Sequence, residues 1–273
     1  MQRQDMQSPL SGQGQVPDMW TPPMGLGGRS ERVSLAELQR FDPLAVSPLA
    51  PDRPVYYFVK RVLDVLISFV ALIVLSPVLL LIALLTRLDS PGPAIFSQTR
   101  VGGRRWSYGG YAYWQRYEFR CFKFRTMVDG ADPSRHRKFI KALIEGKVGP
   151  NDSGEAKFKL AQDSRITRIG RFLRKLSLDE LPQLFNVLRG EMSLVGPRPD
   201  IPYIVELYKP GWHERLAVTA GMTGFWQTHG RGNVTFEEMV EMDITYVRNQ
   251  SLWMDIKILA LTIPAVITGR GAA

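Results

Sequence analysis

The chain has 273 residues, a formal net charge of +9 at pH 7 and 45% hydrophobic residues. It is long enough for one sizeable core, and its basic excess suits nucleic acid, anionic lipid or a phosphorylated substrate. The single cysteine, Cys121, excludes an internal disulfide, and the absence of HExxH and CxxC patterns argues against a zinc site.

Residues 1–52 predict a disordered cytoplasmic tail. They are rich in Gln, Gly, Pro and Met and show little apolar periodicity. No apolar stretch follows their first basic residues, so they lack the layout of a signal peptide. We assign this tail no function.

Residues 53–90 contain a long apolar run. Its core, residues 65–85, is VLISFVALIVLSPVLLLIALL and carries no charge. As a straight helix this core would be about 32 Å long, at a rise of about 1.5 Å per residue. That length is enough to span a bilayer, so a transmembrane anchor is the simplest interpretation.

Two features favour a re-entrant helix-break-helix instead. Pro77 lacks a backbone donor and frees the carbonyl of Ile73, and Ser76 can bend the helix further by bonding back one turn. The residues flanking the run on both sides are basic, and Lys and Arg prefer the cytoplasmic side of a membrane. These residues are Arg53, Lys60 and Arg61 before the run, and Arg87, Arg100, Arg104 and Arg105 after it. We therefore predict a break at Ser76 and Pro77 with both ends cytoplasmic.

The sequence pattern of the remaining residues, 91–273, predicts a membrane-associated domain. Residues 91–102 indicate a turn and a short strand, and 119–127 alternate apolar and basic residues as a half-buried strand does. The aromatic-rich segment 104–121 favours an interfacial belt or a hairpin over a sugar-contacting loop. A helix is expected around 134–145. Residues 251–267 predict a packed or interfacial helix with Trp253 at headgroup level.

A basic run precedes two adjacent acids. Arginines recur every third residue through 164–174 and thus lie on neighbouring parts of a helical face. For Arg165 and Arg168, contact with anionic lipid headgroups explains the pattern as well as any alternative. Arg174 lies one to two turns before Asp179, where it can bind a phosphate bidentately or keep a carboxylate ionised.

The acids Asp179 and Glu180 allow a structural and a chemical interpretation. Ser177 and Glu180 have the spacing of a capping box, which would make Asp179 a first-turn acid of the helix that contains Pro182. A helix N-terminus also attracts phosphate. Neighbouring helical side chains point about 100° apart, so one carboxylate would attack while the other holds a divalent cation or a proton.

Two loops complete the chemical pattern. Pro197 and Pro199 fix the backbone on either side of Arg198, which stiffens the presentation of its guanidinium. Residues 221–232 form a glycine-rich segment that includes Arg231 and lacks the lysine of a Walker A loop. Taken alone, each is a weak signal.

Taken together, these motifs resemble the bacterial sugar transferases of the monotopic phosphoglycosyl transferase family, which start exopolysaccharide and O-antigen synthesis. The resemblance covers roughly residues 55–268, and its most specific block is RITRIGRFLRKLSLDELPQLFNVLRGEMSLVGPRP. It implies an α/β, mainly helical, membrane-associated catalytic domain with a re-entrant membrane helix and interfacial amphipathic helices. The aromatic-rich segment is longer here than the family's usual connection.

The resemblance also implies an activity and its residues. Such enzymes transfer a sugar-1-phosphate from a UDP-sugar to polyprenyl (undecaprenyl) phosphate and release UMP, at the cytoplasmic face of the bacterial inner membrane. Asp179 would be the nucleophile that forms a phosphosugar-aspartyl intermediate, and Glu180 would help bind Mg²⁺. Ser76 and Pro77 match the family's membrane break. Substrate contacts would come from Lys123, Arg125, Arg174, Arg198 and Arg231.

Two other functions are compatible with parts of the sequence. A non-enzymatic membrane adaptor would bind anionic lipid or nucleic acid through the basic surface and turn over no nucleotide sugar. A magnesium-dependent phosphatase acting on lipid diphosphates would release inorganic phosphate. We favour the transferase, expect no nucleic-acid partner, and leave the transferred sugar and a possible homodimer open.

Overall fold

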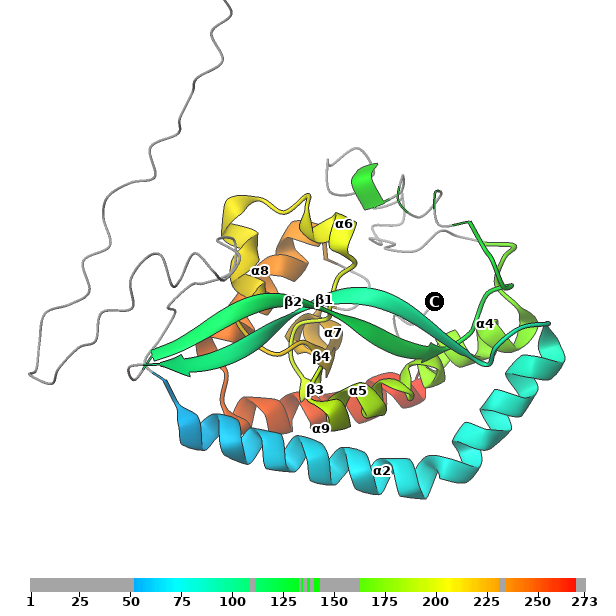
Figure 1. Ribbon diagram of the computed structural model, residues 1–273, viewed down its shortest axis with the longest axis horizontal. Helices are drawn as coiled ribbons and strands as arrows, with labels where there is room; N and C mark the ends of the chain where they lie inside the picture. The colour runs from blue at the N-terminus through cyan, green and yellow to red at the C-terminus, as the bar shows by residue number, and fades with distance from the viewer. Residues whose placement is uncertain are drawn as a thin grey trace, which may run out of the picture. The chain divides into compact units, whose positions relative to one another are not determined.

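The computed structural model describes residues 52–108, 111–132, 134, 137, 140–142, 163–230 and 234–268. All of them belong to one compact unit, Val33–Ala273. This part of the chain combines helices with two small sheets (Figure 1), which confirms the mixed helical and β class. All of the expected tail except Asp52, and most of the helix expected around 134–145, lie outside the described residues.

Helix α2 (Pro54–Asp89) contains the whole apolar run in 36 residues, with Pro77 inside it. The Ser76 hydroxyl donates to the Ile73 carbonyl at 2.8 Å, the bond expected from the proline that follows. Figure 1 shows α2 bent along its length. The chain nevertheless stays helical throughout, so the predicted interruption is a bend within one helix.

The polar and apolar faces of α2 are reversed relative to a helix of a water-soluble protein. Its buried residues are mostly polar, and most of its large hydrophobic residues are exposed, from Val55 to Leu88. In the most apolar window only 11% of residues are buried, and the helix is long and apolar enough to cross a membrane. A soluble helix buries its apolar stripe, so α2 needs an apolar environment outside the protein.

Both ends of α2 are attached to the same folded unit. Near its start, Lys60 forms a 2.7 Å ion pair with Asp255. At its end, the Asp89 carboxylate accepts a hydrogen bond from the Ile169 backbone N–H at 2.9 Å. The two attachments hold the helix against the unit across its bend.

The first sheet is an antiparallel hairpin of β1 (Ile95–Tyr108) and β2 (Tyr111–Phe124). The strand expected within 91–102 is therefore longer than predicted, and the aromatic-rich segment forms the paired ends of both strands. Trp114 is buried against the core, with only 5% of its surface exposed, so it does not belong to an interfacial belt. The hairpin interpretation is confirmed.

The second sheet pairs β3 (Ser193–Val195) in parallel with β4 (Gly221–Thr223). The backbones approach so closely that a Cβ on Gly221 would lie 2.1 Å from the Gly196 nitrogen. Glycine is required at this approach. The contact fixes the start of the loop that carries Arg198.

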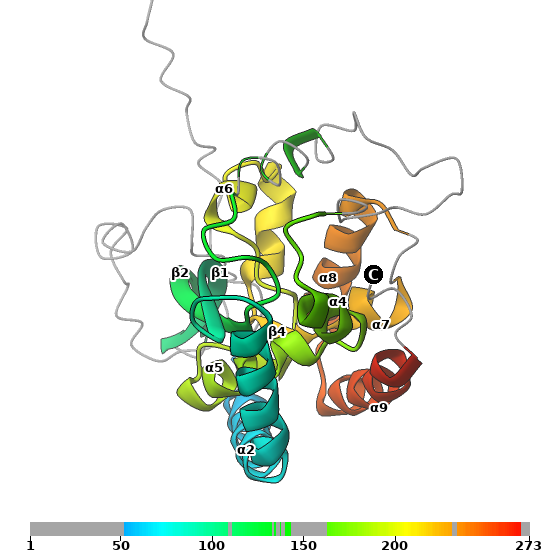
Figure 2. The same cartoon turned by 90° about the vertical axis from the view of Figure 1, so that its right-hand side faces the viewer.

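Short helices surround the sheets. They are α4 (Arg168–Lys175), η1 (Leu178–Glu180), α5 (Gln183–Arg189), α6 (Pro202–Val205), η2 (Pro210–Leu216), α7 (Phe225–His229), α8 (Phe236–Asn249) and α9 (Leu252–Thr268). Helix α9 confirms the helix expected over 251–267. In Figures 1 and 2, α2 and α9 lie on the same side of the unit, below the β1–β2 hairpin, and α6 lies above it.

Candidate active site

Asp179 and Glu180 lie in η1, a single 3₁₀ turn between α4 and α5. Ser177 has a left-handed backbone with φ 55°, and its side chain makes no capping bond. The predicted capping box is therefore wrong, because the Glu180 carboxylate is held by cations from elsewhere in the chain. Helix α5 begins three residues later, at Gln183.

Two cations hold the Glu180 carboxylate. Arg198 donates from both terminal nitrogens, at 3.0 Å to Oε2 and 2.5 Å to Oε1, and Lys123 Nζ donates to Oε1 at 2.9 Å. Burial alone would raise the pKa of Glu180, but Arg198 and Lys123 together hold that pKa well below its ordinary value. Glu180 is thus a fixed anion between the end of β2 and the loop after β3.

The neighbouring Asp179 is in a different environment. Its side chain is buried, and it forms no hydrogen bond or ion pair with another residue in the described part of the chain. Burial, assisted by the adjacent Glu180 charge, raises the pKa of Asp179, while Lys123 is the main opposing influence. A carboxylate that is desolvated and unpartnered keeps its oxygen lone pairs available for attack.

Arg174 supports Asp179 from α4. Its Nε donates to the Thr126 hydroxyl at 2.9 Å, which orients the guanidinium. Its charge is one of the cationic influences on the pKa of Asp179, and burial lowers the pKa of Arg174 itself. Thr126 is a positioning residue that the sequence analysis did not single out.

Two further residues were expected at this site. Arg125 is buried and donates to the carbonyl oxygens of Thr86, Ser90 and Pro91, so its guanidinium caps the C-terminal end of α2. The structure does not bring Arg125 together with the Glu180 cluster. Arg231 lies outside the described residues.

Two arginines, the half-buried Arg100 and the buried Arg215, hold the loop that presents Arg198. Arg100 donates to the carbonyl of Pro199 at 3.0 Å, and Arg215 donates to the carbonyl of Arg198 at 3.3 Å. Arg215 is anchored in turn by ion pairs with Asp200 and Asp243. Sequence analysis missed Arg215, because no local pattern marks it.

The site therefore has more positive than negative charge. Lys123, Arg174 and Arg198 face the two acids, and Arg100 adds a further charge that acts on Lys123. Such a preorganised cationic site stabilises an anionic substrate and the charge that develops during phosphoryl transfer.

A Mg²⁺ ion fits these residues only together with substrate oxygens. No group of three potential metal-ligating side chains occurs among the described residues. Mg²⁺ is commonly held by one or two carboxylates plus substrate phosphates. Glu180 Oε2 accepts one hydrogen bond, from Arg198, and so retains a lone pair.

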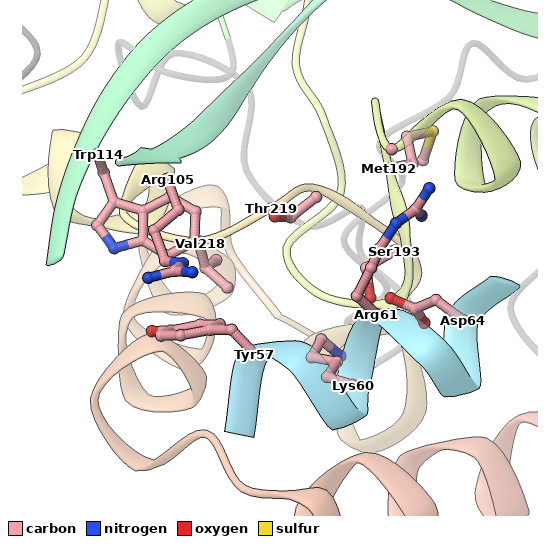
Figure 3. A pocket seen from close by; sticks show the side chains of 11 residues that line it. Tyr57, Lys60, Arg61, Asp64, Arg105, Trp114, Met192, Ser193, Val218 and Thr219 are labelled. Carbon is pink, nitrogen blue, oxygen red and sulfur yellow. The ribbon is translucent and has the colours of Figure 1, made fainter. Parts of the chain in front are cut away.

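A separate pocket lies against the first half of α2. Figure 3 shows Tyr57 of α2 beside Arg105 and Trp114 of the hairpin, with Lys60 and Asp64 farther along the same helix. Its lining contains neither Asp179 nor Glu180. Its cations are engaged within the protein, since Lys60 pairs with Asp255 and Arg105 with Asp52. This pocket therefore belongs to the contact surface between α2 and the rest of the domain.

The chain is similar to known proteins over most of its length. Residues 55–269 match the family described as bacterial sugar transferase. The chain is 39% identical over 220 residues to the exopolysaccharide production protein ExoY of Sinorhizobium fredii, covering 81% of this chain and 90% of that protein. It is 41% identical over 215 residues to undecaprenyl-phosphate galactose phosphotransferase of Salmonella typhimurium, covering 79% of this chain and 42% of the relative. It is 39% identical over 249 residues to undecaprenyl-phosphate glucose phosphotransferase of Komagataeibacter xylinus, covering 86% of this chain and 41% of the relative.

Proposed function

The chain belongs to the bacterial sugar transferase family, and we propose on that basis that it transfers a sugar-1-phosphate from a UDP-sugar to polyprenyl phosphate. The products are polyprenyl-diphosphate-sugar and UMP, and the reaction is the first membrane step of exopolysaccharide synthesis. The names of the relatives that act on undecaprenyl phosphate support this choice of acceptor. The observation that carries it is the unpartnered, buried Asp179 beside a cation-held Glu180.

In the proposed reaction, an Asp179 carboxylate oxygen attacks the phosphorus bonded to the sugar. The bond from that phosphorus to the bridging oxygen breaks, and UMP leaves with the electron pair. An oxygen of polyprenyl phosphate then attacks the same phosphorus and releases the Asp179 carboxylate. The first attack needs no general base when Asp179 is ionised, because an ionised carboxylate carries no proton to remove. Lys123, Arg198 and Arg174 favour that charged form against the burial that raises its pKa.

The cations lower the repulsion between this carboxylate and the diphosphate. Arg198 and Lys123 are fixed by Glu180, so they are in place before the donor arrives. Glu180, together with donor phosphate oxygens, would hold Mg²⁺, which supplies further neutralisation of the diphosphate charge. Arg174 remains oriented by Thr126 toward the region of Asp179.

We also propose that α2 is re-entrant, with the catalytic domain at the cytoplasmic face of the inner membrane. The support is that both ends of α2 are bound to one folded unit while its outward face is apolar. A straight crossing would carry one end away from that unit. The bend at Ser76 and Pro77 allows the helix to enter and leave the same leaflet.

The topology is tested by cysteine labelling. Phe58→Cys and Leu88→Cys, each in a Cys121→Ser background, place one label near each end of α2 at positions that are exposed in the structure. We expect a membrane-impermeant thiol reagent to reach both from the cytoplasmic side. Labelling from opposite sides would contradict the re-entrant arrangement.

The chemistry is tested with Asp179→Asn and the matched control Asp129→Asn, which alters an exposed aspartate. Purified protein is mixed with a panel of UDP-sugars and Mg²⁺, without acceptor, and then measured for UMP and for a mass adduct. We expect an adduct in the wild type and the control and none in Asp179→Asn. Full activity of Asp179→Asn would overturn the proposed nucleophile.

Two further measurements on the same purified protein separate the alternatives. Release of inorganic phosphate from a lipid diphosphate, with no UMP, would favour a phosphatase. Salt-sensitive binding of lipid or nucleic acid with no turnover would favour an adaptor. The family match and the cation-held Glu180 beside the buried Asp179 give no support to the adaptor.

A further inference from the structure

A groove of about 580 Å³ lies between α7 and α9, away from the residues assigned to chemistry. Its lining includes Phe225 and His229 of α7 and Trp253, Lys257 and Leu261 of α9. Its volume falls in the range of small-molecule binding sites, roughly 300–1,000 Å³. Its walls are mainly apolar, so the matching ligand has a hydrocarbon part.

The groove is continuous with the exposed apolar surface of α9. Trp253 is 64% exposed and Leu261 44% exposed, and both also line the groove. Ile263, on the same helix, is 63% exposed and does not line it. Figure 2 shows α9 and α2 on one side of the unit. The side that bears the apolar face of α2 therefore leads into the groove.

The other wall of the groove adjoins the loop that carries Arg198. Helix α7 starts after Gly224, where a Cβ would lie 2.5 Å from the Gly196 carbonyl oxygen, so the two backbones are in contact. The hydroxyls of Thr223 and Thr262 lie 2.8 Å apart and join β4 to α9. The start of α7, which lines the groove, thus lies next to the loop after β3.

Charge in the groove is positive and lies beside aromatic rings. Lys257 Nζ is 5.2 Å from the centroid of the Trp253 ring. The His229 ring is tilted by 33° against the Phe225 ring, with ring centroids 4.4 Å apart. A lysine above an apolar channel suits an amphiphile with an anionic head and a hydrocarbon chain.

We propose that this groove binds the isoprenoid chain of the polyprenyl phosphate acceptor and guides its phosphate out of the lipid toward the loop of Arg198. The inference rests on the proposed function and extends it by assigning the acceptor a route through α7 and α9. Ordinary phospholipid acyl chains are the competing occupant.

The test replaces two isomeric residues of α9, Leu261 and Ile263, each with tryptophan. Leu261→Trp narrows the groove, and Ile263→Trp adds the same bulk to the outward face of α9. Both positions are exposed, so the larger ring fits without repacking the core. UMP release is followed in nanodiscs with donor alone, and the dependence of turnover on polyprenyl phosphate is measured separately.

We expect Leu261→Trp to raise the KM for polyprenyl phosphate about tenfold or more, the affinity contributed by roughly two methylene groups. UMP release with donor alone should stay at the wild-type level in both variants, and Ile263→Trp should keep the wild-type KM. Equal effects of the two variants, or no effect of either, would overturn the groove assignment. Absence of UMP release by the wild-type protein would instead overturn the proposed function.

A measurement that does not depend on turnover decides the occupant. A photoreactive isoprenyl phosphate is crosslinked to the wild-type protein in nanodiscs, and the modified peptides are mapped. We expect crosslinks within residues 225–229 and 253–261 that excess polyprenyl phosphate removes and excess phosphatidylglycerol does not. Removal by phosphatidylglycerol, or crosslinks only on α2, would overturn the proposal.

Discussion

The two-point contact between Arg198 and Glu180 gives the sharpest test of the site. Arg198→Lys preserves the positive charge but replaces the planar fork with one ammonium group. The ammonium can replace one of the two bonds, at 3.0 Å and 2.5 Å, that Arg198 makes with the two Glu180 oxygens. Lys123 remains on Oε1 in either case.

The expected magnitude follows from the one bond that is lost. A hydrogen bond to a charged group contributes about 1.5–3 kcal/mol, and about 1.4 kcal/mol corresponds to a factor of ten. If the fixed position of Arg198 is fully used in the transition state, UMP release with donor alone should slow by about 10- to 150-fold. Single-turnover measurement with saturating UDP-sugar isolates this step from acceptor binding.

The control is Arg248→Lys. Arg248 also makes a two-point contact, from Nε and one terminal nitrogen to the two Glu214 oxygens, at 2.7 Å and 2.6 Å. Its side chain is 65% exposed, against 29% for Arg198, and exposed pairs contribute little. The control should keep the wild-type rate and thermal midpoint. An Arg198→Lys rate within twofold of the wild type would refute the assigned role of the fork.

Three further predictions concern stability and shape. Burial raises the pKa of Asp243 from 3.8 to about 7, against the opposing charge of Arg215. The contribution of Asp243 to the free energy of unfolding is therefore largest below about pH 4 and is lost as pH rises toward about 7. Asp243→Asn should reduce the fall in thermal midpoint measured from about pH 4.5 to 7.5, and an unchanged slope would contradict the assignment. Lys60→Met leaves the Asp255 carboxylate buried without its cation and should lower the free energy of unfolding, measured by chemical denaturation, by about 3–5 kcal/mol. The double variant Lys60→Met/Asp255→Leu should recover most of that loss, and equal stability of the single and double variants would argue against the pair. Pro77→Ala restores the missing backbone donor and should straighten α2. The distance between spin labels at residues 58 and 85 should therefore increase. An unchanged distance would show that packing of α2 against the domain sets the bend.

Local sequence was enough to predict features made by neighbouring residues. Pro77 and Ser76 produce the hydrogen bond to Ile73 that their spacing requires. The apolar composition of 65–85 and 251–267 identifies α2 and α9. In these cases the partners lie within one helical turn, or the signal is summed over many residues.

Features made by distant residues could not be predicted in the same way. The capping interpretation of Glu180 failed because Lys123, 57 residues away, and Arg198, 18 away, compete for its carboxylate. Arg125 lies in a motif expected to contact substrate, but its guanidinium is used by three carbonyls at the end of α2. Arg215 carries no local signal, although it holds the loop of Arg198. A long-range ion pair is decided by the fold, and a local pattern does not contain it.

The polar face of α2 has a consequence for how the protein is made. Lys60 and Asp64 are buried against the domain, and Lys60 finds its partner in Asp255, 195 residues later in the chain. Both residues precede the uncharged run 65–85 and therefore lie near the start of α2. Until Asp255 is synthesised, the native ion pair of Lys60 cannot form. The ionic attachment between the start of α2 and the domain therefore forms only after the beginning of α9 has been synthesised, so this attachment is one of the last parts of the fold to be completed.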